Sequence, residues 1–303
     1  MPVPAVAPVW QIYLKLFLAA VFWGGTFIAG KLLAGQVPPF SAAFLRFLLA
    51  TLLLLMICWR HTGKLPQLGR DDIVVVVLLG LSGVFAYNAF FFAGLNWIEA
   101  GRAAVIVANN PVTIALFAAL LFGEKLPPRA VLGIGLSVAG AITVVIRGDV
   151  SQLVSGGIGR GELLIFGCVV SWTIYSLVGR RAMRHLSPLV AVTCSAAAGT
   201  LLLAPFALAE GLLSQVRFYS LEAWASLIYL ALFGTVIGFV WYYQGIKRLG
   251  STRAGQFINV VPISAVALSV GLLGEPLTAS LLVGLLLVSG GLYLTNRTGS
   301  PKS

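Results

Sequence analysis

The chain has 303 residues, of which 59% are hydrophobic and only 10% are Asp, Glu, Lys or Arg. Soluble globular proteins have about 45–50% apolar and about 25% charged residues, so this chain has too little polar surface for a water-soluble particle. The composition excludes a soluble enzyme, a disordered chain and a nucleic-acid-binding domain. The net charge of +11 then indicates basic cytoplasmic loops that face an anionic leaflet, and the chain is an integral membrane protein.

Apolar runs long enough to cross about 30 Å of hydrocarbon occur ten times along the chain. All of them must be helices, because an open strand edge in lipid leaves backbone groups without hydrogen-bond partners. The predicted spans are residues 12–34, 41–59, 73–95, 101–122, 128–146, 161–179, 187–209, 223–246, 253–273 and 277–295. We therefore predict an all-α integral membrane fold with ten transmembrane helices. The one long connection, 149–161, is rich in Gly and Ser and is interpreted as a linker.

The distribution of Lys and Arg predicts the orientation. If the N-terminus is inside, fourteen of these residues lie on the cytoplasmic side, against five on the outer side. The outer five are Lys31, Arg102, Arg147, Arg160 and Arg217. We expect both termini to be cytoplasmic in a multi-pass protein of the cytoplasmic (inner) membrane. The three cysteines lie in apolar stretches and are interpreted as core residues, and we expect no metal site and no cofactor.

The two halves of the chain are similar to each other. A shift of 149 residues aligns Trp23 with Trp172 and Pro39 with Pro188, and a shift of 151 aligns Gly83 with Gly234 and Pro111 with Pro262. The predicted repeats are residues 12–147 and 160–295. Because each holds five helices, an odd number, the second must enter the membrane inverted relative to the first. Inverted repeats are typical of secondary transporters, which bind substrate near the midplane and work by alternating access.

Three segments carry a family resemblance: FWGGTFIAGK (22–31), NNPVTIALFAALLFGEKL (109–126) and VVPISAVALSVGLLGEPL (260–277). They resemble the drug/metabolite transporter superfamily and, within it, the ten-helix EamA-type branch, with a Pro in helices 4 and 9 and a Gly-Glu after each. The resemblance implies export or exchange of small metabolites, with helices 5 and 10 at the periphery. Within that branch the chain is most similar to bacterial aromatic amino-acid exporters.

Aromatic residues in the spans are the first candidates for a site. Trp23 and Trp172 lie near the centres of helices 1 and 6, where a buried indole needs a hydrogen-bond acceptor and either lines a polar cavity or packs. Trp241 fits either the interfacial belt or the cavity. Tyr87 and Phe91 share one helix face and form either a pocket wall or packing. The candidate set of aromatic substrate-binding residues is Trp23, Tyr87, Phe91, Trp172, Tyr175, Trp241 and Tyr242.

Polar residues in the spans are the second group of candidates. Two prolines, Pro111 and Pro262, are predicted to kink their helices and to free backbone carbonyls. The candidate polar side chains are Asn88, Asn109, Asn110, Asn259 and Arg46. The amides either face the substrate or bridge helices. Arg46 either receives a substrate carboxylate or extends to the outer surface.

The acidic residues all fall in loops or at helix ends, so no buried carboxylate is available as a proton relay. Glu124 and Glu275 are instead expected to cap the helices that follow them. The sequence therefore predicts a secondary transporter that exports amino acids and related metabolites, and not an enzyme. Efflux of cationic or multiple drugs is the alternative, and a passive channel is a weaker one. The expected partners are a small-molecule substrate and membrane lipid, with no nucleic acid; the oligomeric state is open, with a monomer as one option.

Overall fold

The computed structural model describes residues 8–63, 68–123, 126–149, 158–183 and 186–296, and all regular structure in these ranges is helical. Nine helical stretches are long and apolar enough to cross a membrane: Val9–Leu33, Pro39–Arg60, Asp72–Leu95, Ala100–Phe122, Pro128–Val145, Arg160–Ala182, Pro188–Ala209, Leu221–Leu249 and Arg253–Leu273. The tenth predicted span forms a shorter apolar helix, Ala279–Thr295. The predicted all-α membrane fold is confirmed.

Several spans are built from more than one helical element. In chain order the elements are α1 (Val9–Leu33), α2 (Pro39–Thr62), α3 (Arg70–Leu79), η1 (Gly80–Ala86), α4 (Tyr87–Leu95), α5 (Ala100–Val107), α6 (Asn110–Phe122), α7 (Pro128–Val145), α9 (Arg160–Ala182), α10 (Pro188–Ala209), α11 (Leu212–Gln215), η2 (Val216–Phe218), α12 (Leu221–Ala231), η3 (Leu232–Ile237), α13 (Gly238–Leu249), α14 (Ser251–Gln256), η4 (Phe257–Asn259), α15 (Val260–Leu273) and α16 (Ala279–Asn296).

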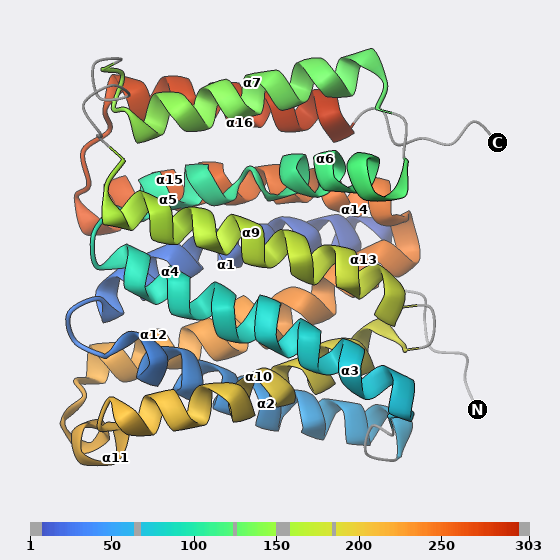
Figure 1. Cartoon of the computed structure of the whole chain (residues 1–303), viewed down its shortest axis with the longest axis vertical. Coiled ribbons are helices and arrows are strands. Elements are labelled where there is room, and N and C mark those ends of the chain that lie inside the picture. The colour runs from blue at the N-terminus through green and yellow to red at the C-terminus, as the bar shows by residue number, and fades with distance from the viewer. Residues whose placement is uncertain (1–7, 64–67, 124–125, 150–157, 184–185, 297–303) are drawn as a thin grey trace.

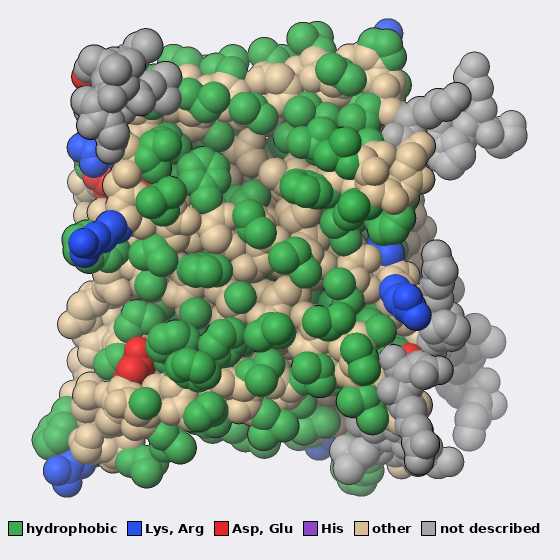
Figure 2. All heavy atoms as spheres, in the orientation of Figure 1, with side chains coloured by type: hydrophobic (Ala, Val, Ile, Leu, Met, Phe, Trp, Pro, Cys, Tyr) green, Lys and Arg blue, Asp and Glu red, His purple; other side chains and the backbone are tan. Residues whose placement is uncertain are grey.

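The helices cross one bundle in alternating directions (Figure 1). The helix α1 begins on the right of this view, whereas α9, the first long helix of the second half, begins on the left. We call the left end, where α4 joins α5, the Glu99 end, and the opposite one the Lys15 end. The Glu99 end is the one that the charge distribution predicts to be outside. Figure 2 shows hydrophobic side chains across one face of the bundle, with Lys and Arg at its two edges, as a lipid-facing surface requires.

The helices α7 and α16 lie side by side at one edge of the bundle (Figure 1). Small residues let their backbones approach: a Cβ added at Gly133 would lie 2.6 Å from the carbonyl oxygen of Gly291, and one at Gly140 would lie 2.7 Å from that of Gly284. Close backbone approach of this kind drives helix association in lipid, where no hydrophobic effect acts between helices. The helices α7 and α16 therefore contact each other more extensively than they contact the rest of the bundle.

Two spans contain a π-helical segment in their middle, η1 in the third and η3 in the eighth. They contain the glycines that the shift of 151 residues aligns, Gly83 and Gly234. A Cβ at Gly83 would collide with the ring of Tyr175, and one at Gly234 would collide with Thr26. Both π-helices are therefore places where a neighbouring helix approaches the backbone closely, and π-helical segments are frequent at functional sites.

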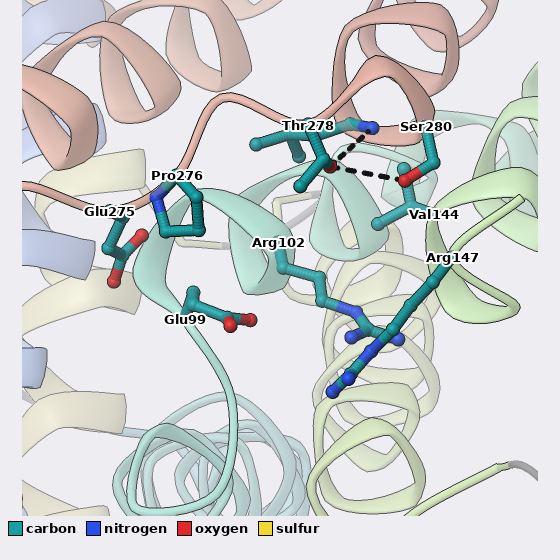
Figure 3. A pocket seen from close by; sticks show the side chains of 9 residues that line it. Glu99, Arg102, Val144, Arg147, Glu275, Pro276, Thr278 and Ser280 are labelled. Carbon is teal, nitrogen blue, oxygen red and sulfur yellow. Dashed lines mark hydrogen bonds between the residues drawn. The ribbon is translucent and has the colours of Figure 1, made fainter.

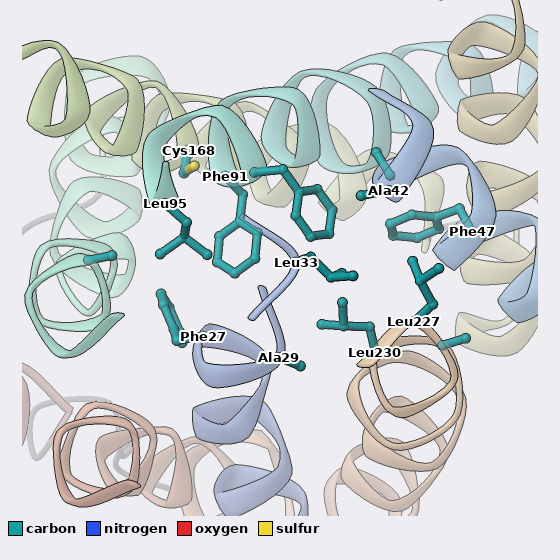
Figure 4. Close-up of a cluster of buried hydrophobic side chains, with 14 of the residues drawn as sticks. Phe27, Ala29, Leu33, Ala42, Phe47, Phe91, Leu95, Cys168, Leu227 and Leu230 are labelled. Carbon is teal, nitrogen blue, oxygen red and sulfur yellow. The ribbon is translucent and has the colours of Figure 1, made fainter. Parts of the chain in front are cut away.

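Burial is uneven along the bundle. All eight residues of α5, at the Glu99 end, are buried, but only three of the thirteen in α6 are. The largest hydrophobic cluster includes Phe27, Leu33, Phe91, Leu95 and Leu227, and Figure 4 shows them converging between the helices. The bundle is therefore closed by packed apolar side chains in the half near the Glu99 end.

Candidate functional site

Arg46 on α2 is a buried cation with only neutral partners. One guanidinium nitrogen, Nη1, donates to Oδ1 of Asn88 at 2.9 Å, and Nη2 lies 3.4 Å from Oγ1 of Thr235. The side chain is only 8% exposed, and its Nε is buried with no acceptor. In the described part of the chain no Asp or Glu lies within ion-pair distance of it. A buried charge is costly without a counter-ion, so this position is suited to an incoming anion.

The two partners of Arg46 are held by the π-helical segments. The amide nitrogen of Asn88 donates to the carbonyl oxygen of Val84 at 2.8 Å, beside the end of η1. The hydroxyl of Thr235, within η3, donates to the carbonyl oxygen of Leu230 at 3.0 Å, five residues earlier. Both side chains are thereby fixed toward Arg46. The guanidinium points into the bundle rather than extending to the surface, the other option that the sequence left open.

An aromatic group lies beside this polar site, on α4 and α9. The ring of Tyr87 stacks on Phe91 with centroids 6.0 Å apart and contacts Trp172 at 5.5 Å. Trp172 stacks in turn on Tyr175 at 5.0 Å. Phe91 is buried, and the other three rings are half-buried. Because Tyr87 directly precedes Asn88, this aromatic group adjoins the Arg46 site and offers flat apolar surface next to a positive charge.

A second aromatic group surrounds Trp23 on α1. The indole Nε1 donates to the carbonyl oxygen of Gly234 at 3.0 Å, and the ring makes edge contacts with Phe239 at 5.6 Å and Tyr242 at 5.2 Å. Since Gly234 precedes Thr235, Trp23 and Arg46 contact neighbouring residues of η3. Trp241 does not join this group; its ring packs on Phe22 at 5.8 Å.

The amides at the helix breaks form a third group. Asn109 lies between α5 and α6, and its Nδ2 donates back to the carbonyl oxygens of Val105 and Ile106 at 3.2 and 3.3 Å. Asn110 begins α6, and Asn259 ends η4 just before α15. The Oδ1 atoms of all three asparagines are buried without a donor. These are therefore three acceptors that no donor of the described residues satisfies.

The two prolines lie where they were expected to interrupt their spans. Pro111 is in the first turn of α6, after the break that follows α5. Pro262 is in the first turn of α15, after the 3-10 segment η4. A proline is tolerated in a first turn, because its missing N–H would have no intrahelical acceptor there. The backbone stays helical before each proline, with φ and ψ of −77° and −2° at Asn109 and of −63° and −19° at Asn259, so each span continues through its proline as one helical stretch.

The structure thus joins Arg46, Asn88, Tyr87, Phe91, Trp172 and Tyr175 in one connected group, and Trp23 with Tyr242 in another. Thr235 and Gly234 link the two, and the sequence analysis missed both. A signal was available for Gly234 alone, because it aligns with Gly83 under the shift of 151 residues. Trp241 and the three asparagines make no direct contact with Arg46 among the bonds of the described residues.

The expected role of Glu275 is wrong. Its carboxylate oxygens accept hydrogen bonds from the backbone N–H groups of Ala100 at 2.7 Å and Gly101 at 3.0 Å, at the start of α5. It therefore caps a helix of the first half and not α16, the helix that follows it. The orphan N–H groups and the dipole at a helix N-terminus attract a carboxylate from any direction, so sequence proximity does not decide the partner. Glu124 lies outside the described residues.

The expectation that no carboxylate is buried is wrong for Glu162, which forms a buried ion pair at the Glu99 end. Nη2 of Arg102, on α5, lies 2.8 Å from Oε1 of Glu162, in the first turn of α9, and both side chains are almost fully buried. At the same end, Nζ of Lys31 donates to the carbonyl oxygens of Leu95 and Ile98, each at 2.8 Å. These contacts cross between helices and hold this end of the bundle together.

Comparison with known proteins identifies the family. The profile of the EamA-like transporter family matches twice, at residues 10–146 and 159–297. The chain belongs to the EamA-like transporter family. This EamA-like chain is 24% identical to a protein of known crystal structure, with a TM-score of 0.65 over 96% of this chain and 99% of the other. The fold is therefore shared with an experimentally determined structure.

Relatives of the chain are transporters in bacteria and archaea. The uncharacterized transporter YyaM of Bacillus subtilis is 30% identical over 279 residues, which are 92% of this chain and 91% of YyaM. The uncharacterized inner membrane transporter YedA of Escherichia coli is 30% identical over 87% of this chain and 83% of its own. A probable amino-acid metabolite efflux pump of Salmonella typhimurium is 26% identical over 91% of this chain and 92% of the pump. The chain is a multi-pass membrane transporter, and its substrate requires a separate argument.

Proposed function

We propose that this transporter exports amino acids, aromatic ones among them, and related small metabolites across the cytoplasmic membrane. The observation that carries the proposal is Arg46, a buried guanidinium with an unused Nε and no carboxylate partner in the described ranges. A carboxylate bound there supplies the missing counter-charge and accepts charge-assisted hydrogen bonds. The similarity to a probable amino-acid metabolite efflux pump supports the same substrate class.

The ammonium group and the side chain of an amino acid could be bound by the asparagines and by the aromatic rings. The free Oδ1 atoms of Asn109, Asn110 and Asn259 are acceptors of the kind that an ammonium group requires. The rings of Tyr87, Trp172 and Tyr175 offer a stacking surface for an aromatic or large apolar side chain. One substrate would not need to contact all of these groups in a single conformation.

We further propose that residues 12–147 and 160–295 are two inverted repeats that rock against each other, with both termini in the cytoplasm. The family profile matching each half separately supports the division. In this proposal the apolar packing and the Arg102–Glu162 ion pair near the Glu99 end close the outer side in the present conformation. The substrate then enters from the cytoplasm and leaves when these contacts separate.

Efflux of cationic drugs is the competing function. Aromatic walls favour cations, but the positive charge of Arg46 repels them, and no carboxylate in the described chain offsets it. The deciding experiment is counterflow in proteoliposomes that contain the purified protein, with labelled phenylalanine, alanine, phenylalaninamide and an organic cation, with and without a pH gradient. Saturable counterflow of the two free amino acids supports the proposal. Faster movement of the amide or the cation contradicts it, and non-saturable flux indicates a channel.

A further inference from the structure

A cavity of about 260 Å³ lies at the Glu99 end, apart from the Arg46 site. It is formed by the start of α5, the end of α7 and the connection from α15 to α16. The side chains that line it include Glu99, Arg102, Arg147, Glu275, Thr278 and Leu281. Figure 3 shows the carboxylate of Glu99 and the guanidinium groups of Arg102 and Arg147 gathered on one side of this cavity.

Some charged side chains of the cavity have hydrogen-bond or ion-pair partners, and others have none within the described ranges. Arg102 is paired with Glu162 at 2.8 Å and also donates to the carbonyl oxygen of Val145 at 2.5 Å. Glu275 is engaged by two backbone N–H groups of α5. Glu99 and Arg147 make no side-chain hydrogen bond or ion pair within the described ranges, although the charge of each acts on Arg102. The cavity therefore presents one negative and one positive charge that are free to bind a ligand.

Two features place the anionic part of such a ligand near the arginines. The Nε of Arg102 is a donor with no acceptor, on a residue that is only 6% exposed. Arg147 follows α7, two residues after its last residue Val145, in the left-handed backbone conformation with φ of 55°, which is uncommon for a residue other than glycine. Figure 3 shows its side chain alongside that of Arg102. Adjacent guanidinium groups with a spare donor are suited to a phosphate.

The surroundings of the cavity are those of a lipid. The last turns of α7 expose Val138 and Ile142, and the first turns of α16 expose Leu282 and Leu286 by 44% and 64%. These apolar side chains are on the same two helices, α7 and α16, that contribute Val144, Ser280 and Leu281 to the cavity and form one edge of the bundle (Figure 1). Acyl chains can therefore lie along α7 and α16 while the headgroup occupies the cavity.

We propose that this cavity binds the headgroup of a zwitterionic phospholipid that carries a primary ammonium group. The phosphate lies between Arg147 and the Nε of Arg102, and the ammonium group donates to Glu99. A net-anionic headgroup would leave Glu99 unpaired, and a quaternary ammonium group has no N–H to donate to it. Because Arg102 and Glu275 also hold α5 to α9 and α15, a bound lipid braces the contacts that close the Glu99 end.

The test is lipid retention by the full-length protein, measured by native mass spectrometry after delipidation and titration with phosphatidylethanolamine, phosphatidylcholine or phosphatidylglycerol of identical acyl chains. We expect phosphatidylethanolamine to be retained best. Arg147→Gln and Glu99→Gln should each lower its occupancy about three- to fivefold, because both side chains are partly in water. Arg217→Gln is the matched control, since Arg217 is an exposed arginine of the same end that lies over the ring of Phe218.

Three results would overturn the proposal: equal retention of the three lipids, an equal loss in the Arg217→Gln control, or full displacement of the lipid by soluble phosphoethanolamine. The last would indicate a site for a free zwitterionic solute. Thermal unfolding of each variant in detergent identifies any that fail to fold. In that case the single variants are replaced by one double variant with swapped charges, Glu99→Arg with Arg147→Glu. This variant should retain phosphatidylethanolamine in preference to the other two lipids. No transport is measured, so the outcome is independent of the proposed substrate.

Discussion

The hydroxyl groups of Thr51 on α2 and Thr200 on α10 lie 3.1 Å apart and share a hydrogen bond. These residues are 149 positions apart, the same shift that aligns Trp23 with Trp172. In the proposed inverted arrangement, two equivalent residues that bond to each other would lie on the axis that relates the two halves. On α7 and α16, Ser137 donates to the carbonyl oxygen of Val288, and those residues are separated by the other repeat shift, 151. Both contacts are what a two-fold relation between the halves requires.

The first prediction concerns the inverted orientation of the halves. Cysteines placed at Trp97 and Leu221 should react with an impermeant maleimide from the periplasm, and those at Arg129 and Met183 only after the cytoplasmic side is opened. All four positions are exposed, and the native Cys58, Cys168 and Cys194 are buried, so background labelling should be low. Reaction of Trp97→Cys and Leu221→Cys from opposite sides would rule out the inverted arrangement.

The second prediction concerns Arg46. Arg46→Gln should weaken binding of free amino acids about ten- to hundredfold, because a charge-assisted hydrogen bond contributes roughly 1.5–3 kcal/mol. Amides and esters of the same amino acids should be affected much less. The measurement is counterflow in proteoliposomes at several substrate concentrations, with Arg46→Lys as the variant that keeps the charge. Equal losses for acids and amides would mark Arg46 as structural.

The span boundaries could be predicted closely because bilayer thickness fixes them. The predicted span 101–122 corresponds to Ala100–Phe122, and 187–209 corresponds to Pro188–Ala209. The irregular turn before Pro111 could also be predicted, because proline lacks a backbone N–H. The last span, α16, begins at Ala279 rather than at the predicted residue 277, since Pro276 and the residues around it form an irregular connection.

The contacts of the site were less predictable, because they join helices that are distant in the sequence. Arg46 and Asn88 were separate candidates, and nothing in their own segments indicated that η3 would bring Thr235 to the same guanidinium. The pairing of Arg102 with Glu162 could not be predicted either, because the two residues are distant in the sequence and a charge at a helix end can pair with many others. Hydropathy specifies that a helix crosses the membrane, but it does not specify its rotation or its neighbours.

The third prediction concerns the ion pair at the Glu99 end. Arg102→Gln and Glu162→Gln should each destabilise the protein by roughly 3–5 kcal/mol, because removal of one partner leaves the other charge buried and unpaired. The double variant should lose less than the sum of the two. Chemical unfolding in mixed micelles measures the three variants against the parent. Additive losses would show that the 2.8 Å contact between the two side chains contributes little.

The last prediction separates the two repeat-related indoles. Trp172 stacks on Tyr175 and contacts Tyr87, and in the described structure its indole N–H has no acceptor. Trp172→Ala should therefore reduce transport of aromatic amino acids more than that of alanine or threonine. Aromatic pairing contributes roughly 0.5–1.5 kcal/mol, so the selective loss should be about two- to tenfold. Folding should survive, because a half-buried ring is lost rather than a core residue.

Trp23 should behave differently, because its N–H holds the carbonyl oxygen of Gly234 at 3.0 Å, next to Thr235. Trp23→Phe keeps an aromatic ring but removes this bond, which contributes about 0.5–1.5 kcal/mol. Since η3 also supplies the hydroxyl near Arg46, all carboxylate substrates should be affected alike, and the melting temperature should fall. Trp172→Phe is the matched control, with little change in stability. If Trp23→Phe leaves stability unchanged and selectively impairs aromatic substrates, then Trp23 contacts the substrate directly instead of positioning η3.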